Sequence, residues 1–416
     1  MIVTNVVQQH ADDAAALATH RPALASSAYA KLQRLNRADQ RLGAHLDGLK
    51  LAGEHALPFY EAALENPSAG ALFILTVKAL GDKDKSQLDQ LMALARAVPQ
   101  TLDGLLCALG WMERSRLQGV VAGLLRDPDG FRRMIGVAAC AMHRVDPGIA
   151  SGSYLQDDDP AVRARSFRAA GELGLVELVS ACAAASRRDD QPEVQFWALW
   201  SAVLLGDRNV GVEVLKKRGL SPGAHRTRAF RLALQATSTS AAHGLLQQLA
   251  RDPQQVRWLI QGSGIAGDPV YVPWLIQRMA ELNTARLAGE AFAIMCGVDL
   301  GGAALDRPAP ENFESGPNDD PDDPNVDMDP DDGLTWPDVV KIETWWRENG
   351  SRFAPGTRYF MGAPVTREHC IDVLKNGYQR QRILAAHYLC LLEPGTPLFN
   401  TSAPAWRQQR LLAKLT

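Results

Sequence analysis

The segment from Gly316 to Gly333 holds the densest group of side chains in this sequence that could do chemistry. It contains eight aspartates interleaved with prolines and very few apolar residues. Such a chain of carboxylates could dock onto a positively charged partner, raise the association rate and mimic a chain of phosphates. Tryptophans that follow the segment could act as binding hot spots. The candidate partner-binding residues are Asp319, Asp320, Asp322, Asp323, Asp327, Asp329, Asp331, Asp332, Trp336, Trp345 and Trp346.

The same aspartates allow two other interpretations. Asp327, Asp329 and Asp331 match the first, third and fifth positions of an EF-hand-like calcium loop, and Asp338 matches the twelfth. Position six, however, is Asp332, where the sharp turn of such a loop needs glycine. We therefore expect no metal ion here. A solvated insertion that binds nothing remains open beside the docking hypothesis.

Other motifs that could support catalysis are weak. Residues 262–267 match G-x-G-x-x-G, which marks a dinucleotide site only between a strand and a helix. Here the motif ends a predicted helix, where small residues permit close packing. The nine histidines show no metal-ligand spacing, and a helix would point His369 and Cys370 away from each other. We expect neither an enzyme nor a cofactor.

The charge balance of the 416 residues singles out the same acidic segment. Lys and Arg number 44 and Asp and Glu 47, a formal net charge of −3. Residues 306–338 alone carry twelve acidic residues and one basic residue, which leaves the rest with an excess of about eight positive charges. Arginines of this basic body, among them Arg163, Arg165 and Arg168, could line a groove for nucleic acid. We disfavour nucleic acid as a partner, because exposed arginines are common on helices.

The sequence also bears on the compartment. The first ten residues lack the basic and apolar regions of a signal peptide, and the longest apolar stretches are too short to cross a bilayer. Six scattered cysteines without a CxxC pair predict buried reduced thiols. We expect a cytoplasmic protein without membrane contact.

A repeat organises the chain. Prolines recur about every 31 residues, at Pro67, Pro99, Pro128, Pro160, Pro192, Pro222 and Pro253. Asp-Pro pairs at 127–128, 159–160 and 252–253 supply an N-cap and a first helical residue. Fourteen residues after four of these prolines comes a glycine suited to end the helix, at Gly81, Gly174, Gly206 and Gly267. Two helices in each period cannot bury their faces alone, so the repeats must stack.

These observations predict an all-α fold, an α-α superhelix with a long acidic loop near the C-terminus. Residues 1–60 are expected to form a helical cap, 61–305 the repeats, 306–338 the acidic Pro/Asp-rich loop and 339–416 a C-terminal helical region. The cap should contain helices at 11–19 and 38–52. The C-terminal region should contain helices at 337–348, 367–374 and 379–392, followed by a tail.

The repeats resemble HEAT repeats of the short bacterial kind. The resemblance rests on Asp159-Pro160-Ala161-Val162-Arg163 and, with one extra residue, on residues 252–257, and it covers roughly residues 60–300. It implies a HEAT-like solenoid, a fold that serves as a general binding surface.

Four further segments, residues 44–49, 138–147, 288–292 and 316–320, are similar to a proteobacterial HEAT-repeat family often encoded beside type VI secretion genes. That resemblance implies an immunity or accessory role without catalytic residues. The leading hypothesis is an immunity protein that neutralises a cognate basic toxin, such as a nuclease encoded nearby. An effector chaperone or adaptor is the alternative within the same class.

The rival hypothesis is enzymatic. Some bacterial HEAT-like solenoids are DNA glycosylases, which excise alkylated bases with an aspartate while Trp and Arg hold the DNA. Trp345-Trp346-Arg347 would fit that pattern. The acidic segment speaks against it, because it would repel DNA.

Overall fold

The computed structural model describes residues 3–149, 153–311, 313, 316 and 328–415. These residues form α-helices joined by short connections, together with one antiparallel hairpin of two-residue strands, β1 (Tyr359–Phe360) and β2 (Ala363–Pro364). The predicted all-α fold class is confirmed. The sequence does not predict the hairpin, because its strands are too short to leave an alternating pattern.

The chain divides into two compact units, residues 1–207 with 374–416 and residues 208–373. The first unit contains α1 (Thr4–Leu24), α2 (Leu32–Ala52), α3 (Leu57–Glu65), α4 (Ala69–Asp82), α5 (Lys85–Ala97), α6 (Leu102–Trp111), α7 (Arg114–Leu117), α8 (Val120–Leu125), α9 (Gly130–Met142), α10 (Pro160–Leu173), α11 (Val179–Arg188), α12 (Pro192–Leu204), α21 (Gln379–Leu392) and α22 (Ala405–Leu412). The second contains α13 (Val210–Leu220), α14 (Arg226–Ala236), α15 (Thr239–Leu249), α16 (Val256–Ala266), α17 (Val272–Arg278), α18 (Leu282–Cys296) and α19 (Val339–Asn349). Helix α20 (Arg367–Asn376) spans the boundary at Val373.

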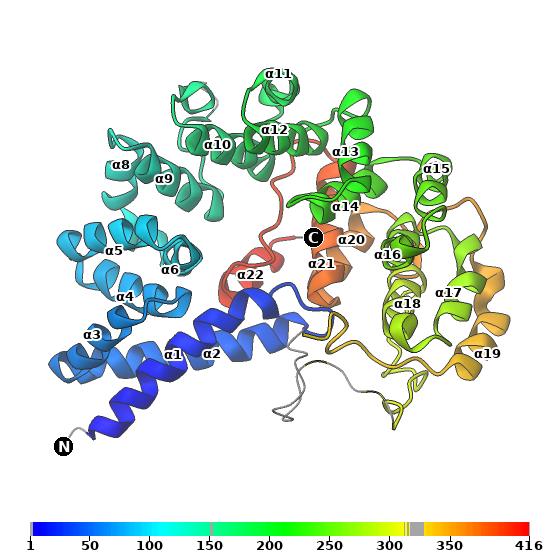
Figure 1. Cartoon of the computed structure of the whole chain (residues 1–416), viewed down its shortest axis with the longest axis horizontal. Helices are drawn as coiled ribbons and strands as arrows, with labels where there is room; N and C mark the ends of the chain where they lie inside the picture. The colour runs from blue at the N-terminus through cyan, green and yellow to red at the C-terminus, as the bar shows by residue number, and fades with distance from the viewer. Residues whose placement is uncertain (1–2, 150–152, 312, 314–315, 317–327, 416) are drawn as a thin grey trace. The chain divides into compact units, whose positions relative to one another are not determined.

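Within each unit, successive helices pack neighbour on neighbour. In the first unit, α4, α6, α9, α10 and α12 each contact the next, and their order can be followed by colour in Figure 1. In the second unit, α14, α16 and α18 do the same. The predicted boundaries at 60, 305 and 338 are not those of the two units. The predicted C-terminal region is shared between them, since α19 lies in the second unit and α21 and α22 in the first.

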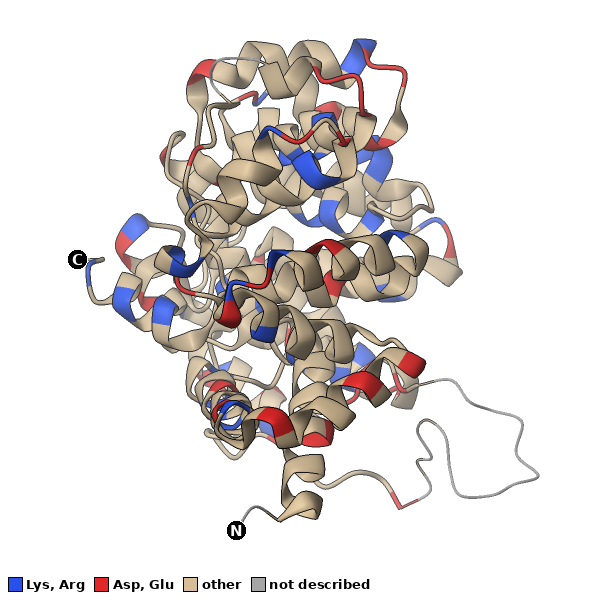
Figure 2. Ribbon diagram, turned by 90° about the vertical axis from the view of Figure 1, so that its left-hand side faces the viewer, with Lys and Arg blue, Asp and Glu red and all other residues tan. Residues whose placement is uncertain are grey.

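Two ion pairs join neighbouring helix connections in the first unit. The Arg133 guanidinium donates to both carboxylate oxygens of Asp157 at 2.7 and 2.8 Å, and Arg163 donates to those of Asp189 at 3.0 and 3.1 Å. Arg163 also donates to the carbonyl oxygen of Asp157. The result is a ladder in which each arginine joins two connections. Figure 2 shows basic and acidic residues mixed over many of the helices and connections.

The Asp-Pro pairs begin helices in only some of the predicted places. Asp159 is the N-cap of α10, with Pro160 as the first helical residue. Asp252 caps a 3-10 turn that leads into α16. The prediction at Asp127 is wrong: Asp129 caps α9, and the Asp127 carboxylate instead accepts a hydrogen bond from the Asp129 backbone N–H. Both aspartates can cap a backbone N–H, and their spacing alone does not distinguish them.

The glycine signal for helix ends is right at three of its four positions. Gly174 and Gly267 take left-handed φ angles of 74° and 71° at the ends of α10 and α16. Gly81 lies inside α4, and Lys83 takes the left-handed position instead. Gly206 has a φ of 119° and ends α12, where its N–H donates to Val203 and the Asp207 N–H donates to Ala202. The small residues of the G-x-G-x-x-G match do permit close packing, because a Cβ on Gly264 would lie 2.8 Å from the Ala291 Cα.

Replacing Asp159 by Ala should lower the free energy of unfolding by about 1 kcal/mol, because its carboxylate accepts the Ala161 N–H at the start of α10. Urea denaturation followed by circular dichroism measures the change. Asp158→Ala is the control, since Asp158 is exposed and precedes the cap. Equal effects of the two substitutions would contradict the assigned cap.

The predicted C-terminal tail has structure of its own. Residues 394–407, which we call the C-terminal strap, run along the ends of the first unit's repeat helices and include the first three residues of α22. The Leu398 N–H donates to the Glu172 carbonyl oxygen in α10, Asn400 donates to Met142 in α9, and Arg407 donates to Gly110 and Met112 at the end of α6. The strap therefore supplies hydrogen-bond donors to helix C-termini that would otherwise lack them.

A second strap does the same in the second unit. It comprises residues 356–362, around the β1–β2 hairpin. The Tyr359 N–H donates to Gly267 at the end of α16, and the N–H groups of Met361 and Gly362 donate to Ile294 and Met295 in α18. The Arg358 side chain donates hydrogen bonds to four carbonyl oxygens at the ends of α14 and α16. Neither strap is predicted from the sequence, because the repeat pattern has ended where they begin.

Candidate functional site

The structure locates six of the eleven predicted partner-binding residues. Asp319, Asp320, Asp322, Asp323 and Asp327 lie outside the described residues. Asp332 is exposed, whereas Asp331 and Trp336 are 4% and 8% exposed. Asp329, Trp345 and Trp346 are partly buried. The placed residues belong to the second unit and gather near α18 and α19.

Asp329 and Asp331 are bound to arginines of the repeat helices. The carboxylate of Asp329 pairs with Arg286 of α18, with a shortest N–O distance of 2.7 Å. Asp331 accepts from both terminal nitrogens of Arg257 in α16. The Asp331 carbonyl oxygen also accepts from Arg286, at 3.1 Å. These two aspartates therefore attach the end of the acidic segment to the body.

Their position extends the ladder seen in the first unit. There, Arg133 and Arg163 receive a carboxylate from the next repeat. Arg257 receives only the backbone carbonyl of Asn283 from that side, at 2.9 Å, and its carboxylate comes from Asp331. Asp331 of the acidic segment thus provides the carboxylate for Arg257, which the connection at Asn283 does not provide.

Phe313, before the acidic segment, and Trp336, after it, both contact Arg286. Their rings meet edge to face with centroids 4.7 Å apart. The Arg286 guanidinium lies 4.8 Å from the Trp336 ring centroid and 4.9 Å from that of Phe313. Arg307 contacts Trp336 from the other direction at 5.8 Å. The chain therefore leaves this point at Phe313 and returns to it at Asp329.

Trp345 and Trp346 anchor α19 in the core of the second unit. The ring of Trp345 packs edge to face on Phe292, 5.6 Å between centroids, and Trp346 lies 5.6 Å from Phe353. Both belong to the rim of the buried cluster around these phenylalanines. The tryptophans on which the glycosylase hypothesis drew are thus engaged in packing.

The described aspartates that match EF-hand-like positions do not form a calcium-binding loop. Asp329 and Asp331 face guanidinium groups, and Asp338 caps α19 by accepting the Lys341 N–H. The described part of the chain also contains no group of three His, Cys, Asp or Glu side chains placed to hold a metal ion.

A hydrogen-bonded Tyr-His-Asp chain is the constellation that sequence reasoning missed. The Tyr271 hydroxyl lies 2.5 Å from His243 Nδ1, and His243 Nε2 lies 3.1 Å from the Asp268 carboxylate. Burial and nearby Asp268 raise the pKa of Tyr271 to about 12, the opposite of what a nucleophile requires. Asp268 also accepts the Gly356 N–H of the second strap. This arrangement holds the strap rather than activating a hydroxyl.

The pair of His369 and Cys370 does not form an activated thiol. All six cysteines are free, and five are buried. Burial raises the pKa of Cys370 to about 12, and its neighbour His369 bonds to the Phe360 carbonyl oxygen at 2.7 Å. Likewise, Arg163, Arg165 and Arg168, which could have lined a nucleic-acid groove, are each paired with a carboxylate.

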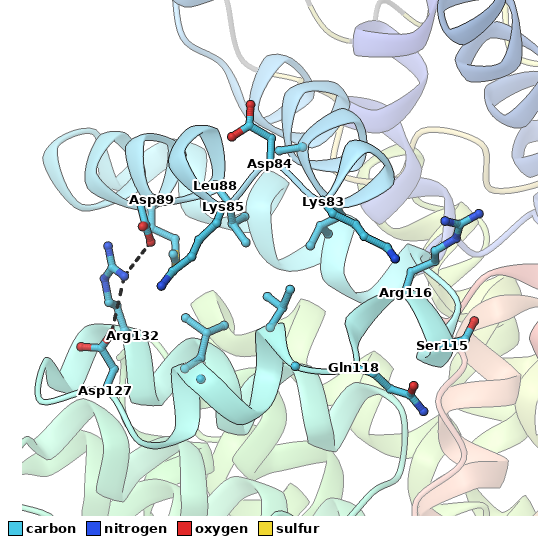
Figure 3. A pocket seen from close by; sticks show the side chains of 17 residues that line it. Lys83, Asp84, Lys85, Leu88, Asp89, Ser115, Arg116, Gln118, Asp127 and Arg132 are labelled. Carbon is cyan, nitrogen blue, oxygen red and sulfur yellow. Dashed lines mark hydrogen bonds and ion pairs between the residues drawn. The ribbon is translucent and has the colours of Figure 1, made fainter.

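An open cleft with a basic rim lies between α4–α5 and α7–α8 of the first unit (Figure 3). It measures about 530 Å³, and apolar side chains such as Leu80, Leu88 and Leu124 line it. In Figure 3, Lys85 points into the space and Lys83 points toward Arg116. Arg132, by contrast, is paired with Asp89 and Asp127. The cleft can hold an anionic group at its rim above an apolar floor.

The cleft exists because the second helix of this repeat is broken. Residues 114–125 form two short helices, α7 and α8, separated at Gly119, which has a φ of 84°. The sequence carries a faint signal of this break, since the interval from Pro99 to Pro128 is the shortest and lacks the glycine ending. That signal indicates an irregular repeat and does not reveal a cleft.

Among the helices of the described residues, none combines the length and apolarity needed to cross a lipid bilayer. No protein-family model, no curated protein and no solved structure matches this chain.

Proposed function

We propose that this chain is a non-enzymatic binding protein whose acidic segment docks onto a positively charged protein. More specifically, we propose an immunity protein that neutralises a type VI secretion toxin in the cytoplasm of the producing cell. The sequence resemblance supplies the secretion context. The anchoring of the acidic segment is the structural observation that supports binding.

That anchoring matters for recognition. Phe313 and Asp329 bracket the segment, and both contact Arg286. Five aspartates, at 319, 320, 322, 323 and 327, lie between these two attached residues. Attachment at both sides limits the conformational entropy that the segment loses on binding. The carboxylates would compete for the basic, phosphate-binding surface of a toxin such as a nuclease.

Replacing Asp319, Asp320, Asp322 and Asp323 together by Asn should lower the association rate for the toxin by about tenfold at low salt, because charge steering sets that rate. The toxin tested is the product of the adjacent gene. Surface plasmon resonance at several ionic strengths measures the rate, and survival of cells that co-express the toxin measures protection.

The matched control replaces four exposed acids of the first unit, Asp12, Glu54, Glu61 and Glu65, by their amides. It changes the net charge equally and should leave association within about twofold. Unchanged binding and protection by the Asp-to-Asn variant would show that the acidic segment is not the recognition element.

A further inference from the structure

Three partly buried arginines of the first unit surround a single carboxylate. Arg165 and Arg168 lie on one face of α10 with Glu172, and Arg144 follows the end of α9. Glu172 is 7% exposed and accepts from Arg165 Nη2 at 2.9 Å and from Arg168 Nε at 2.8 Å. We call these four residues the arginine cluster. Three positive charges against one negative leave it with an excess of two.

The hydrogen bonds of the cluster are incomplete. Arg165 Nη1 is buried and has no hydrogen-bond partner among the described residues. Among the described residues, the Arg144 side chain donates to the carbonyl oxygens of Ala141 and Leu398. Because the neighbouring guanidiniums outweigh burial, the pKa of Glu172 falls to about 2, while burial lowers the pKa of Arg165. Buried charge without a counter-charge is costly, so a further anion beside these arginines would be stabilising.

A cavity of about 300 Å³ lies against the cluster. Its walls include Phe73 and Trp111, and the C-terminal strap lines it through Asn400 and residues 402–404. Two other charged residues also line it. Arg21 is already paired with Asp39 at 2.7 Å, and Asp103 is exposed to solvent. Neither cancels the excess charge of the cluster.

We propose that this cavity binds a phosphate dianion, free or as a small phosphomonoester, held by Arg165 Nη1 together with Arg144 and Arg168. A phosphate carries about −1.5 to −2 charges at pH 7, which matches the excess of two. Guanidinium forks pair with phosphate oxygens in two parallel hydrogen bonds. Arg168, whose side chain is 38% exposed, gives the ion a route from solvent. The cavity has room for an organic group beside the aromatic walls.

Isothermal titration calorimetry of the full chain with inorganic phosphate, at constant ionic strength set by chloride, tests the proposal. We expect one saturable site per chain. Arg165→Gln should raise the dissociation constant about tenfold or more, which corresponds to the loss of one charged pair. Because that variant could fold poorly, Arg168→Gln, at the more exposed edge, provides a second one and should raise it by about threefold or more.

The control is Arg187→Gln with Arg188→Gln, which removes two exposed charges from α11 outside the cavity and should leave phosphate affinity unchanged. Phenyl phosphate distinguishes the two sources: tighter binding than inorganic phosphate identifies a phosphomonoester site, and equal or weaker binding identifies a site for the free ion. Absence of saturable binding to either probe below about 10 mM would overturn the proposal. So would equal affinity in the wild type and both arginine variants.

Discussion

Replacing Glu172 by Gln is expected to lower the free energy of unfolding by about 3 to 5 kcal/mol, the cost of breaking a buried ion pair by removing one partner. The carboxylate is the counter-charge for Arg165 and Arg168, and it also lowers the energy of Arg144 nearby. Glutamine keeps the shape but leaves three guanidiniums without a negative charge inside the cluster. The predicted loss therefore comes from uncompensated charge and not from a cavity.

The same carboxylate predicts how stability depends on pH. The pKa of Glu172 is lowered from its usual 4.5 to about 2 in the folded protein. A group with a lowered folded pKa contributes its stability above the unfolded pKa and loses it as the pH falls toward the folded pKa. The difference in stability between the wild type and Glu172→Gln should thus be constant above pH 5 and shrink between about pH 4.5 and 2.

Urea denaturation at a series of pH values measures both effects. Glu177→Gln is the matched control, because Glu177 is an exposed glutamate just beyond the same helix and should change stability by less than about 0.5 kcal/mol. A Glu172→Gln loss no larger than that of the control would show that the arginines do not depend on this carboxylate. If a phosphate ion binds the cluster, added phosphate should restore part of the loss.

The sequence predicts the local features of the fold well. The all-α class, helices α19 to α21 within two residues, and the cap at Asp159 all follow from periodicity, proline and capping residues. Helices α1 and α2 are present but begin seven and six residues before the predicted ones. Those signals act over a few residues of chain. Where two local solutions compete, as between Asp127 and Asp129, the sequence does not choose between them.

Long-range partners are what the sequence does not reveal. Arg257 and Asp331 are 74 residues apart, and Arg21 contacts the backbone at Ser402, 381 residues away. Neither pair has a spacing that marks it in advance. The aspartates of the acidic segment look alike in sequence, yet Asp331 is buried against an arginine while Asp332 is exposed. The sequence therefore singles out a candidate region, and the contacts of its described members required the structure.

Arg358 also has partners that are far away in the sequence, and replacing it should have a large effect on stability. It lies in the second strap, and its guanidinium donates to the carbonyl oxygens of Leu234, Gln235 and Thr237 at 2.8 to 2.9 Å and of Ala266 at 3.1 Å. These carbonyls end α14 and α16, where the helix dipole favours a positive charge. Arg358→Met should lower the free energy of unfolding by about 3 kcal/mol, because each charged hydrogen bond is worth about 1.5 kcal/mol or more and water can replace some of them.

Hydrogen exchange monitored by mass spectrometry measures the loss of stability in Arg358→Met and shows which helices it affects. Amides of α14, α16 and the β1–β2 hairpin should exchange faster in Arg358→Met, whereas those of α4 and α6 should not change. Arg358→Lys should recover only part of the protection, since one ammonium cannot reach four carbonyl oxygens in the geometry of a planar fork. Arg347→Met on the exposed side of α19 is the control and should behave as the wild type. If Arg358→Met exchanged no faster than this control, the carbonyls would not depend on the strap, and the second strap would be a passive connection between α19 and α20.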